Sequence, residues 1–236
     1  MTSEDTFKRY SRQIFIEEVG LEGQKRIMGS KVLVIGAGGL GSPIIQYLSA
    51  AGVGTLGAAD FDLVELHNLN RQIIHTENSV GTAKVKSAKN FVENLNRQIN
   101  FVAIEQKINS ANAAEILSQY DIIVDGSDNF STRYLVNDTC VKLKKTLVYG
   151  SILGFSGQLA VFNHKGSKNL RDIFPDPPFD EDVPDCDSLG VLGALPGIIG
   201  SMMALQTLKI ITELPVNLNQ ITLVDTFNWR FQTIDF

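Results

Sequence analysis

The chain has 236 residues, of which 44% are hydrophobic and 20% are charged, and its formal net charge at pH 7 is −5. These fractions are ordinary for a globular protein with a sizeable core, and the acidic balance argues against a broad nucleic-acid-binding surface. The two cysteines, Cys140 and Cys186, lie far apart in the chain. They form no disulfide framework, so a reducing cytoplasm is the expected location. Cys140 lies between apolar residues of a predicted helix and is expected in the core.

No segment of the sequence indicates a membrane protein. The N-terminus is polar and acidic, unlike a signal peptide. The longest apolar run, residues 190–208, is interrupted by glycine and proline. We interpret this run as a loop that enters a buried helix.

The first two thirds of the chain alternate predicted helices with predicted strands. Residues 9–30 have helical spacing, and residues 31–38 form a β-branched run of the kind that a sheet covers on both faces. The later strands are expected at 55–62, 99–108, 120–128 and 146–152, and the helices at 41–52, 81–96, 112–119 and 131–145. This alternation predicts an α/β fold with a Rossmann-like, mostly parallel sheet flanked by helices.

The pattern changes after the fifth strand. Residues 157–164 read as a strand with partial alternation, and residues 165–188 are rich in proline and acids without any periodicity. A helix is expected at about 198–212, and residues 220–236 form two strands or one bent strand. We therefore expect a C-terminal antiparallel extension of the sheet and a long crossover loop over 165–190.

A glycine-rich turn follows the first predicted strand. Gly36, Gly38 and Gly41 fit the spacing G-x-G-x-x-G, with Gly39 between them, and a helix follows. Such a turn lets backbone N–H groups approach a phosphate. Asp60 ends the second strand, where an acid can bind ribose hydroxyls. A tight turn without a ligand is the alternative, and the glycines alone do not identify the nucleotide.

The residues beyond the second strand favour a triphosphate. Asn68, Arg71, Gln72 and Lys84 fall on the nucleotide side of the predicted sheet. Arg71 and Lys84 are cations that can converge on phosphates, and a neutral nicotinamide needs no such pair.

The fourth predicted strand ends in acids. Asp125, Asp128 and Asn129 come at its carboxyl end, where open α/β sheets bind their ligands. A carboxylate beside a triphosphate is the usual way to hold Mg²⁺.

These motifs together resemble one family. The blocks are "RYSRQ", "GAGGLGSP", "DFDLVELHNLNRQ", "VGTAKV", "DGSDNFSTRYLVN" and "GSILGFSGQLAVF". They resemble the ThiF/MoeB/HesA family, adenylyltransferases that activate ubiquitin-like sulfur carriers in thiamine and molybdopterin biosynthesis. The resemblance runs from about Arg9 to Phe236. It implies a single adenylating domain over 1–236, with a nucleotide-binding half at 1–150 and a carrier-binding half at 151–236.

The resemblance implies a role for each matching position. The carboxylate of a carrier that ends in Gly-Gly would attack the α-phosphate of ATP, with Mg²⁺ held by Asp128. Arg12 would reach the phosphates bound by the partner subunit, since family members are homodimers with shared sites. The residues implied to act in catalysis are Arg12, Arg71, Lys84, Asp128 and Cys186. The residues implied to bind the cofactor are Gly36, Gly38, Gly39, Gly41, Asp60, Asp62, Asn68, Gln72 and Asn129.

The sequence departs from the family at two places. Asn169 and Asp172 stand where many relatives have the first cysteine pair of a structural zinc site, so we expect no zinc. Cys186 matches a cysteine that some relatives use for sulfur transfer, with a sulfur donor protein as a further partner. Asp185 and Asp187 flank it and would raise its pKa, so an unreactive loop cysteine remains an equal alternative.

Three hypotheses about function follow. A thiamine-type carrier adenylyltransferase is our main prediction, and the molybdopterin type is its close alternative. A nicotinamide-dependent oxidoreductase is the second, and Arg71 and Lys84 argue against it. A non-catalytic binding relative is the third. The histidines His67, His75 and His164 are scattered and are expected to be structural rather than catalytic.

Overall fold

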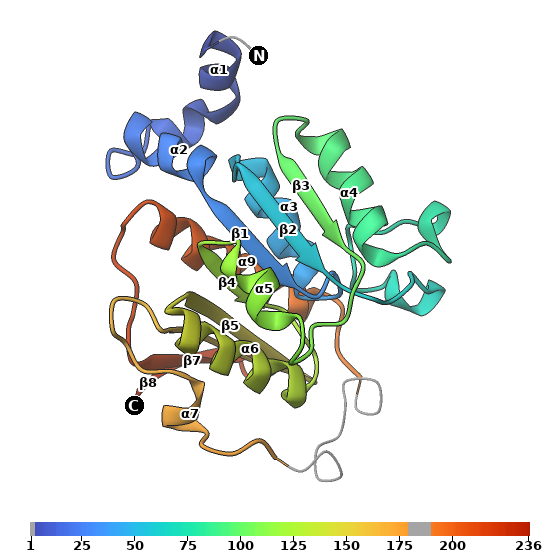
Figure 1. The fold of residues 1–236 in the computed structure, drawn as a ribbon, viewed down its shortest axis with the longest axis vertical. Coiled ribbons are helices and arrows are strands. Elements are labelled where there is room, and N and C mark those ends of the chain that lie inside the picture. The colour runs from blue at the N-terminus through green and yellow to red at the C-terminus, as the bar shows by residue number, and fades with distance from the viewer. Residues whose placement is uncertain (1–2, 179–189) are drawn as a thin grey trace.

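The computed structural model describes residues 3–178 and 190–236, and an eight-stranded sheet runs through it in the order β3-β2-β1-β4-β5-β6-β7-β8 (Figure 1). The strands are β1 Lys31–Ile35, β2 Thr55–Ala59, β3 Asn100–Ile104, β4 Ile122–Asp125, β5 Thr146–Leu153, β6 Ser156–Phe162, β7 Gln220–Asp225 and β8 Arg230–Asp235. Strands β1 to β5 pair in parallel with one another, and the pairs β5–β6, β6–β7 and β7–β8 are antiparallel. The predicted fold class, with its antiparallel C-terminal extension, is confirmed.

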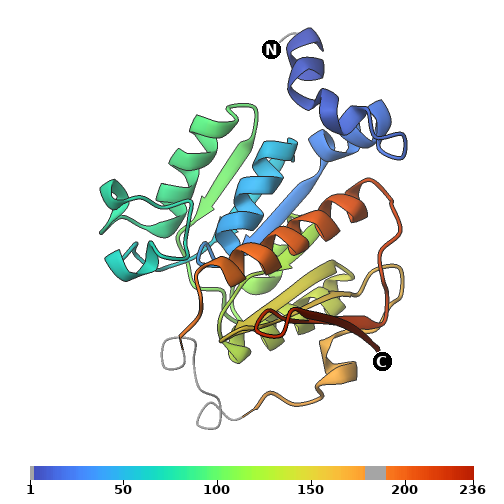
Figure 2. The same ribbon diagram turned by 180° about the vertical axis from the view of Figure 1, so that it is seen from behind.

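Helices cover both faces of this sheet. The helices are α1 Ser3–Ile14, α2 Gly20–Gly29, α3 Gly41–Ala51, α4 Lys84–Leu95, α5 Ala113–Ser118, α6 Phe130–Leu143, α7 Leu170–Ile173 and α9 Ala194–Ile211, with short 3-10 turns η1 Leu66–Asn68 and η2 Glu77–Ser79. Helices α3, α4 and α9 lie on one face, and α5 and α6 lie on the other (Figures 1 and 2). Helices α1 and α2 extend beyond the end of the sheet where β1 begins (Figure 1).

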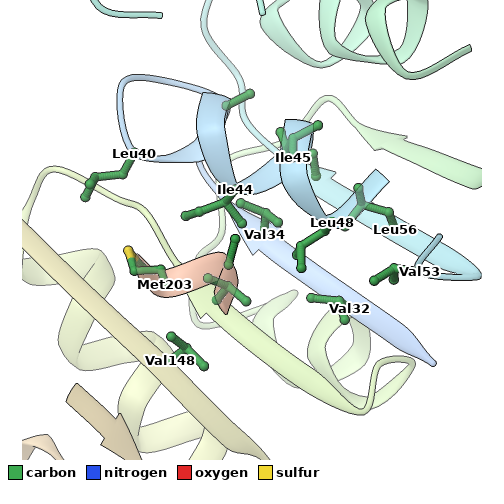
Figure 3. Packing of buried hydrophobic residues seen from close by; sticks show 14 of the residues in the cluster. Val32, Val34, Leu40, Ile44, Ile45, Leu48, Val53, Leu56, Val148 and Met203 are labelled. Atoms are coloured by element: carbon green, nitrogen blue, oxygen red, sulfur yellow. The ribbon is translucent and has the colours of Figure 1, made fainter. Parts of the chain in front are cut away.

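Strand β1 shows why the sheet is covered twice. Val32 and Val34 belong to the hydrophobic cluster under α3 and α9, whereas Leu33 and Ile35 belong to the cluster under α5 and α6. Side chains alternate along a strand, so an uninterrupted apolar run supplies both layers. Figure 3 shows the first layer, where Val34 faces Ile44 of α3 beside Met203 of α9.

Three element boundaries differ from the sequence-based expectation. Residues 9–30 form two helices rather than one, separated at residues 15–19. The predicted loop contains α7, whose N-cap Asn169 accepts a hydrogen bond from the Arg171 N–H. Helix α9 begins at Ala194 and not at 198, because Pro196 sits in the first helical turn, where a backbone N–H has no helical partner.

Helix α9 is a core helix of the sheet. Among residues 3–178 and 190–236 it alone is long and apolar enough to cross a membrane, and half of it is buried within the protein. It packs against α3, β5 and β6 (Figure 2). Its apolar composition is therefore explained by contacts with its own chain.

Candidate functional site

A cavity of about 350 Å³ opens at the carboxyl ends of β1, β2 and β4. Strands of parallel α/β sheets bind ligands at this edge. Its lining includes most of the predicted site: Gly36, Gly38, Gly39, Asp60, Asp62, Arg71, Gln72, Lys84, Asp128 and Asn129. Side chains from segments far apart in the sequence thus meet in one place.

The glycine loop is the wall nearest to β1. Gly36 has φ 87°, and a Cβ atom there would stand 3.0 Å from the carbonyl oxygen of Gly126 in the loop after β4. A Cβ at Gly41 would collide with the carbonyl oxygen of Gly36. Both positions therefore require glycine, and the loop is tight enough to present its backbone to a ligand.

Asp60 fastens this loop to the end of β2. Its Oδ2 accepts a hydrogen bond from the Ala37 N–H at 2.8 Å, and its Oδ1 accepts one from the Asp62 N–H, also at 2.8 Å. Burial raises the pKa of Asp60, and the charge of Lys84 acts in the opposite direction. Asp60 lines the cavity where it can also meet a ribose.

Lys84 and Asp62 form an ion pair at the cavity wall. The Lys84 Nζ atom lies 2.8 Å from Oδ2 of Asp62, and the lysine side chain is only 9% exposed. The backbone repeats this contact, because the Lys84 N–H donates to the Asp62 carbonyl. Lys84 is the first residue of α4, so its ammonium is held at a fixed position.

Arg71 and Gln72 approach from the turn that follows η1. Arg71 donates from Nη1 to the carbonyl oxygen of His67 at 3.1 Å and to Oδ1 of Asn70 at 3.2 Å, and it lines the cavity. Gln72 is buried beside Gly38, and its Oε1 has no hydrogen-bond partner among the described residues. A buried amide oxygen without a partner is costly, which fits a ligand group at this position.

Asp128 and Asn129 stand on the opposite wall, at the start of α6. The Asn129 side chain caps the helix by accepting the Thr132 N–H at 2.9 Å, and it donates to Oδ1 of Asp128 at 3.2 Å. The Asp128 carboxylate is exposed within the cavity lining. Asp128 therefore lines the same cavity as Lys84 and Arg71 and can meet the same ligand.

The sequence prediction missed the buried polar group behind this wall. Arg133 is 4% exposed, lines the cavity, and donates to the Ser127 carbonyl at 2.7 Å and to the Tyr149 hydroxyl at 3.0 Å. Burial raises the pKa of Asp125, whose Oδ1 accepts the Ser127 N–H at 3.0 Å. Arg133 follows Asn129 by one helical turn, so the i, i+4 spacing could have placed it on this face.

Three predicted residues lie away from the cavity lining. Asn68 has a local role, because its side chain accepts the Glu65 N–H at 3.0 Å and shapes the 3-10 turn before Arg71. Gly41 acts inside the loop, as described above. Arg12 is exposed on α1, at the end of the sheet opposite to the cavity (Figure 1).

The cysteines have separate outcomes. Cys140 is buried in the cluster under α6, and burial raises the pKa of its thiol, so its predicted core position is confirmed. Cys186 lies outside the described residues, as do residues 179–189 of the predicted crossover loop.

The histidines are dispersed, as expected. His75 is buried, His67 is exposed beside Glu65, and His164 is half-buried beside Thr146. None of them lines the cavity.

Curated relatives are about half identical to this chain over the aligned residues. The adenylyltransferase and sulfurtransferase MOCS3 of Culex quinquefasciatus is 53% identical over 203 residues, which cover 86% of this chain and 46% of the relative. The Arabidopsis thaliana protein of the same name is 50% identical over 208 residues, covering 88% and 45% respectively. The chain therefore spans about half the length of the curated relatives it matches.

Solved structures share the fold at low identity. The crystal structure of E. coli MccB with ATP superposes with a TM-score of 0.85 at 20% identity, covering 100% of this chain and 73% of that one. The crystal structure of PaaA gives a TM-score of 0.84 at 20% identity, covering 100% and 74%.

A family model agrees with the motifs and with the cavity they build. The model of the ThiF family matches residues 10–236, nearly the whole chain and both halves of the sheet. With the glycine loop, the strand-end acids and the paired lysine in the places described, the chain belongs to the ThiF family.

Proposed function

We propose that this protein is an ATP-dependent adenylyltransferase that activates the C-terminal Gly-Gly carboxylate of a ubiquitin-like sulfur carrier. One observation carries the proposal: Arg71, Lys84 and Asp128 converge on a single cavity beside a glycine loop. A nucleoside triphosphate suits a site in which cations and a carboxylate surround a loop whose backbone N–H groups can bind phosphate. Relatives at about half identity are named adenylyltransferases, which supports the same chemistry.

The reaction requires little proton transfer. A carboxylate oxygen of the carrier forms a bond to the α-phosphorus of ATP, the bond from that phosphorus to the bridging oxygen breaks, and pyrophosphate leaves. The products are an acyl-adenylate and pyrophosphate. The attacking carboxylate is already ionised, so the protein has to neutralise charge and align the groups. Lys84 and Arg71 supply that positive charge.

The cavity is suited to a magnesium ion held mainly by the nucleotide. Within residues 3–178 and 190–236 no cluster of three or more His, Cys, Asp or Glu side chains could hold a metal alone. Mg²⁺ in ATP sites is bound by one or two carboxylates together with phosphates, and Asp128 supplies such a carboxylate. The ion would neutralise charge on the departing pyrophosphate.

The pathway is a finer proposal. Our main sequence-based prediction was the thiamine type, with the molybdopterin type as its alternative. The relatives are named for an adenylyltransferase and a sulfurtransferase activity together, and their name fits the molybdopterin-type alternative better. We therefore propose that the carrier is of the molybdopterin type.

The carrier would dock on the C-terminal half. Strand β8 is exposed along its length, and Trp229 and Phe231 stack edge to face with ring centres 5.9 Å apart. Phe155 and Phe227, whose rings are 5.4 Å apart, lie at the turns before β6 and after β7. Ile152, just before Phe155, lines the cavity. An exposed aromatic surface of this kind is typical of a protein-binding site.

A homodimer would complete the site. Arg12 belongs to α1, which lies beyond the end of the sheet where β1 begins, and it is not part of the cavity lining at the carboxyl end of β1 (Figure 1). The family resemblance implies that this arginine contacts the phosphates of the nucleotide bound by the partner subunit. We propose shared sites on this basis, with the sulfur donor as a separate protein.

Pyrophosphate exchange tests the proposal. The protein is incubated with ATP, Mg²⁺, labelled pyrophosphate and purified carriers that end in Gly-Gly, and a carrier lacking the last glycine serves as the control. Exchange that depends on the intact Gly-Gly end supports the function. ATP binding without exchange for any carrier would favour a non-catalytic relative. Preferential binding of NAD over ATP in thermal shift would favour an oxidoreductase.

A further inference from the structure

His75 is a buried histidine outside the cavity lining that contacts the glycine loop from behind. It is 5% exposed, and its Nε2 lies 2.9 Å from the carbonyl oxygen of Ala37. Its Nδ1 lies 2.8 Å from Oγ of Ser87 in α4. The ring therefore connects α4 to the glycine loop.

The hydrogen-bond partners define the tautomer. The Ala37 carbonyl can only accept, so Nε2 carries the proton and donates it. Nδ1 then accepts from the Ser87 hydroxyl. Burial lowers the pKa of His75, and the nearby charge of Lys84 lowers it further, in keeping with a neutral ring. Besides Lys84, the charged groups near this part of the loop are Asp60 and Asp62.

The Ala37 peptide groups are thus held from two sides. Asp60 accepts from the Ala37 N–H, and His75 donates to the Ala37 carbonyl. Ala37 is fully buried, so water cannot replace either partner. Both flanking peptide planes of Ala37 are fixed by side chains from outside the loop.

The second of these planes carries a donor for the ligand. The Ala37 carbonyl and the Gly38 N–H belong to one planar trans peptide and point in opposite directions. Gly38 is part of the cavity lining, and His75 is not. Because His75 binds the Ala37 carbonyl on the side of the loop away from the cavity, the Gly38 N–H of the same peptide is turned toward the cavity. Among the described residues, no hydrogen bond uses that N–H.

We infer that His75 is a positioning residue of the nucleotide site, which aims the Gly38 N–H at a phosphate of ATP through the Ala37–Gly38 peptide. The inference rests on the proposed function, because it takes ATP as the ligand. It assigns His75 no contact with the nucleotide and no role in proton transfer. Its effect is therefore on phosphate binding, and not on the adenosine part.

Calorimetry on purified variants tests this role. In His75→Ala we expect the Kd of ATP to rise about tenfold, equivalent to about 1.4 kcal/mol. The affinity for adenosine, measured by competition with ATP, stays within about twofold of wild type. His75→Gln keeps an amide N–H of similar reach and recovers most of the ATP affinity. In pyrophosphate exchange, the same loss appears in KM for ATP, with kcat within about threefold of wild type.

Two further variants keep the test decisive. His164→Ala is the matched control, since His164 also meets a hydroxyl, that of Thr146 at 3.1 Å, but lies outside the cavity lining. It should leave both affinities unchanged. If His75→Ala does not fold, Ser87→Ala weakens the same chain of hydrogen bonds from its far end and should raise the Kd of ATP about threefold.

The outcomes separate this inference from the proposed function. A wild-type protein that does not bind ATP contradicts the proposed function itself. A wild type that binds ATP while His75→Ala binds it equally well overturns only the role of His75. Parallel losses for ATP and adenosine, or a folded His75→Gln without recovery, would mean that His75 supports the cavity as a whole and does not aim the Gly38 N–H.

Discussion

The ammonium of Lys84 lies 2.8 Å from the carboxylate of Asp62, and the Lys84 backbone N–H donates to the Asp62 carbonyl as well. The segments between them, residues 63–83, carry Arg71 and Gln72 into the cavity. The pair therefore closes the base of a loop whose residues face the cavity. In the proposed reaction, Asp62 would act through Lys84.

This relationship predicts a non-additive pair of substitutions. Lys84→Met should lower pyrophosphate exchange by at least ~100-fold, the scale of one preorganised electrostatic group. Asp62→Asn should lower it about tenfold, and the double variant should be no worse than Lys84→Met alone. Lys86→Met is the control, because Lys86 forms a similar pair with Glu105 on the surface. Losses that simply multiply in the double variant would show that Asp62 acts on its own.

Asp128 is expected to set the magnesium dependence. Asp128→Ala should reduce exchange by at least ~100-fold, and the Mg²⁺ concentration for half-maximal activity should rise. Asp121→Ala removes an acid from the other end of β4, where it accepts the Lys31 N–H, and should leave that concentration unchanged. Full exchange activity in Asp128→Ala would remove this carboxylate from the site.

Subunit mixing tests the shared site. Arg12→Ala and Arg71→Ala chains should each be inactive alone. In a randomly mixed homodimer about a quarter of the sites regain both arginines, because half of the dimers are hybrids and each hybrid has one intact site. Exchange activity is measured after native mass spectrometry has verified the hybrids. Inactive hybrids would mean that both arginines must come from the same chain, and an active Arg12→Ala protein would remove Arg12 from the mechanism.

Trp229 and Phe231, at the start of β8, should affect the binding of the carrier and not that of ATP. Trp229→Ser and Phe231→Ser are each expected to raise KM for the carrier about tenfold or more, the scale of an interface hot spot. The Kd of ATP should not change, since neither residue lines the cavity. Val141→Ser, which alters an exposed apolar residue of α6, is the control. Unchanged KM values in both strand variants would move the carrier to another surface.

The buried histidine should make stability depend on pH. The folded state holds the pKa of His75 below its ordinary value of 6.5, so the unfolded state takes up the proton first as the pH falls. The free energy of unfolding then decreases below pH 6.5, by at most about 1.4 kcal/mol per pH unit. His75→Gln lacks this contribution and should show a flatter profile between pH 7 and 5 in urea unfolding.

The comparison of wild type with His75→Gln isolates the contribution of His75 to the pH dependence of stability. Burial raises the pKa values of Asp60 and Asp125, and this makes a contribution of opposite sign, with stability lost as the pH rises through their titration. Both carboxyl groups are present in either protein and cancel in the difference. If the free energy of unfolding changes equally with pH in wild type and His75→Gln, burial does not lower the pKa of His75.

The sequence predicted what depends on short-range pattern. Strand β1 is an apolar run and the strand-end acids Asp60 and Asp128 follow such runs, so their meeting at one sheet edge follows from parallel topology. The contact of His75 with Ala37 could not be predicted, because these residues are 38 positions apart and meet only in the folded chain. Arg133 was missed although its spacing from Asn129 places it on the same helix face, because a buried arginine is not expected from composition alone. Asn68 was expected at the phosphates, whereas the structure shows a local hydrogen bond that periodicity does not reveal.

The seam between β5 and β6 limits how this protein can move. The strands pair from Leu147 with Phe162 to Leu153 with Ser156, so the parallel and antiparallel parts of the sheet are one hydrogen-bonded body. A hinge between them would break a row of backbone hydrogen bonds in the buried sheet. The distance from the glycine loop to the aromatic residues at the start of β8 is therefore constant. A carrier whose flexible tail is too short to span it would bind without reacting, and tail length would then select the substrate.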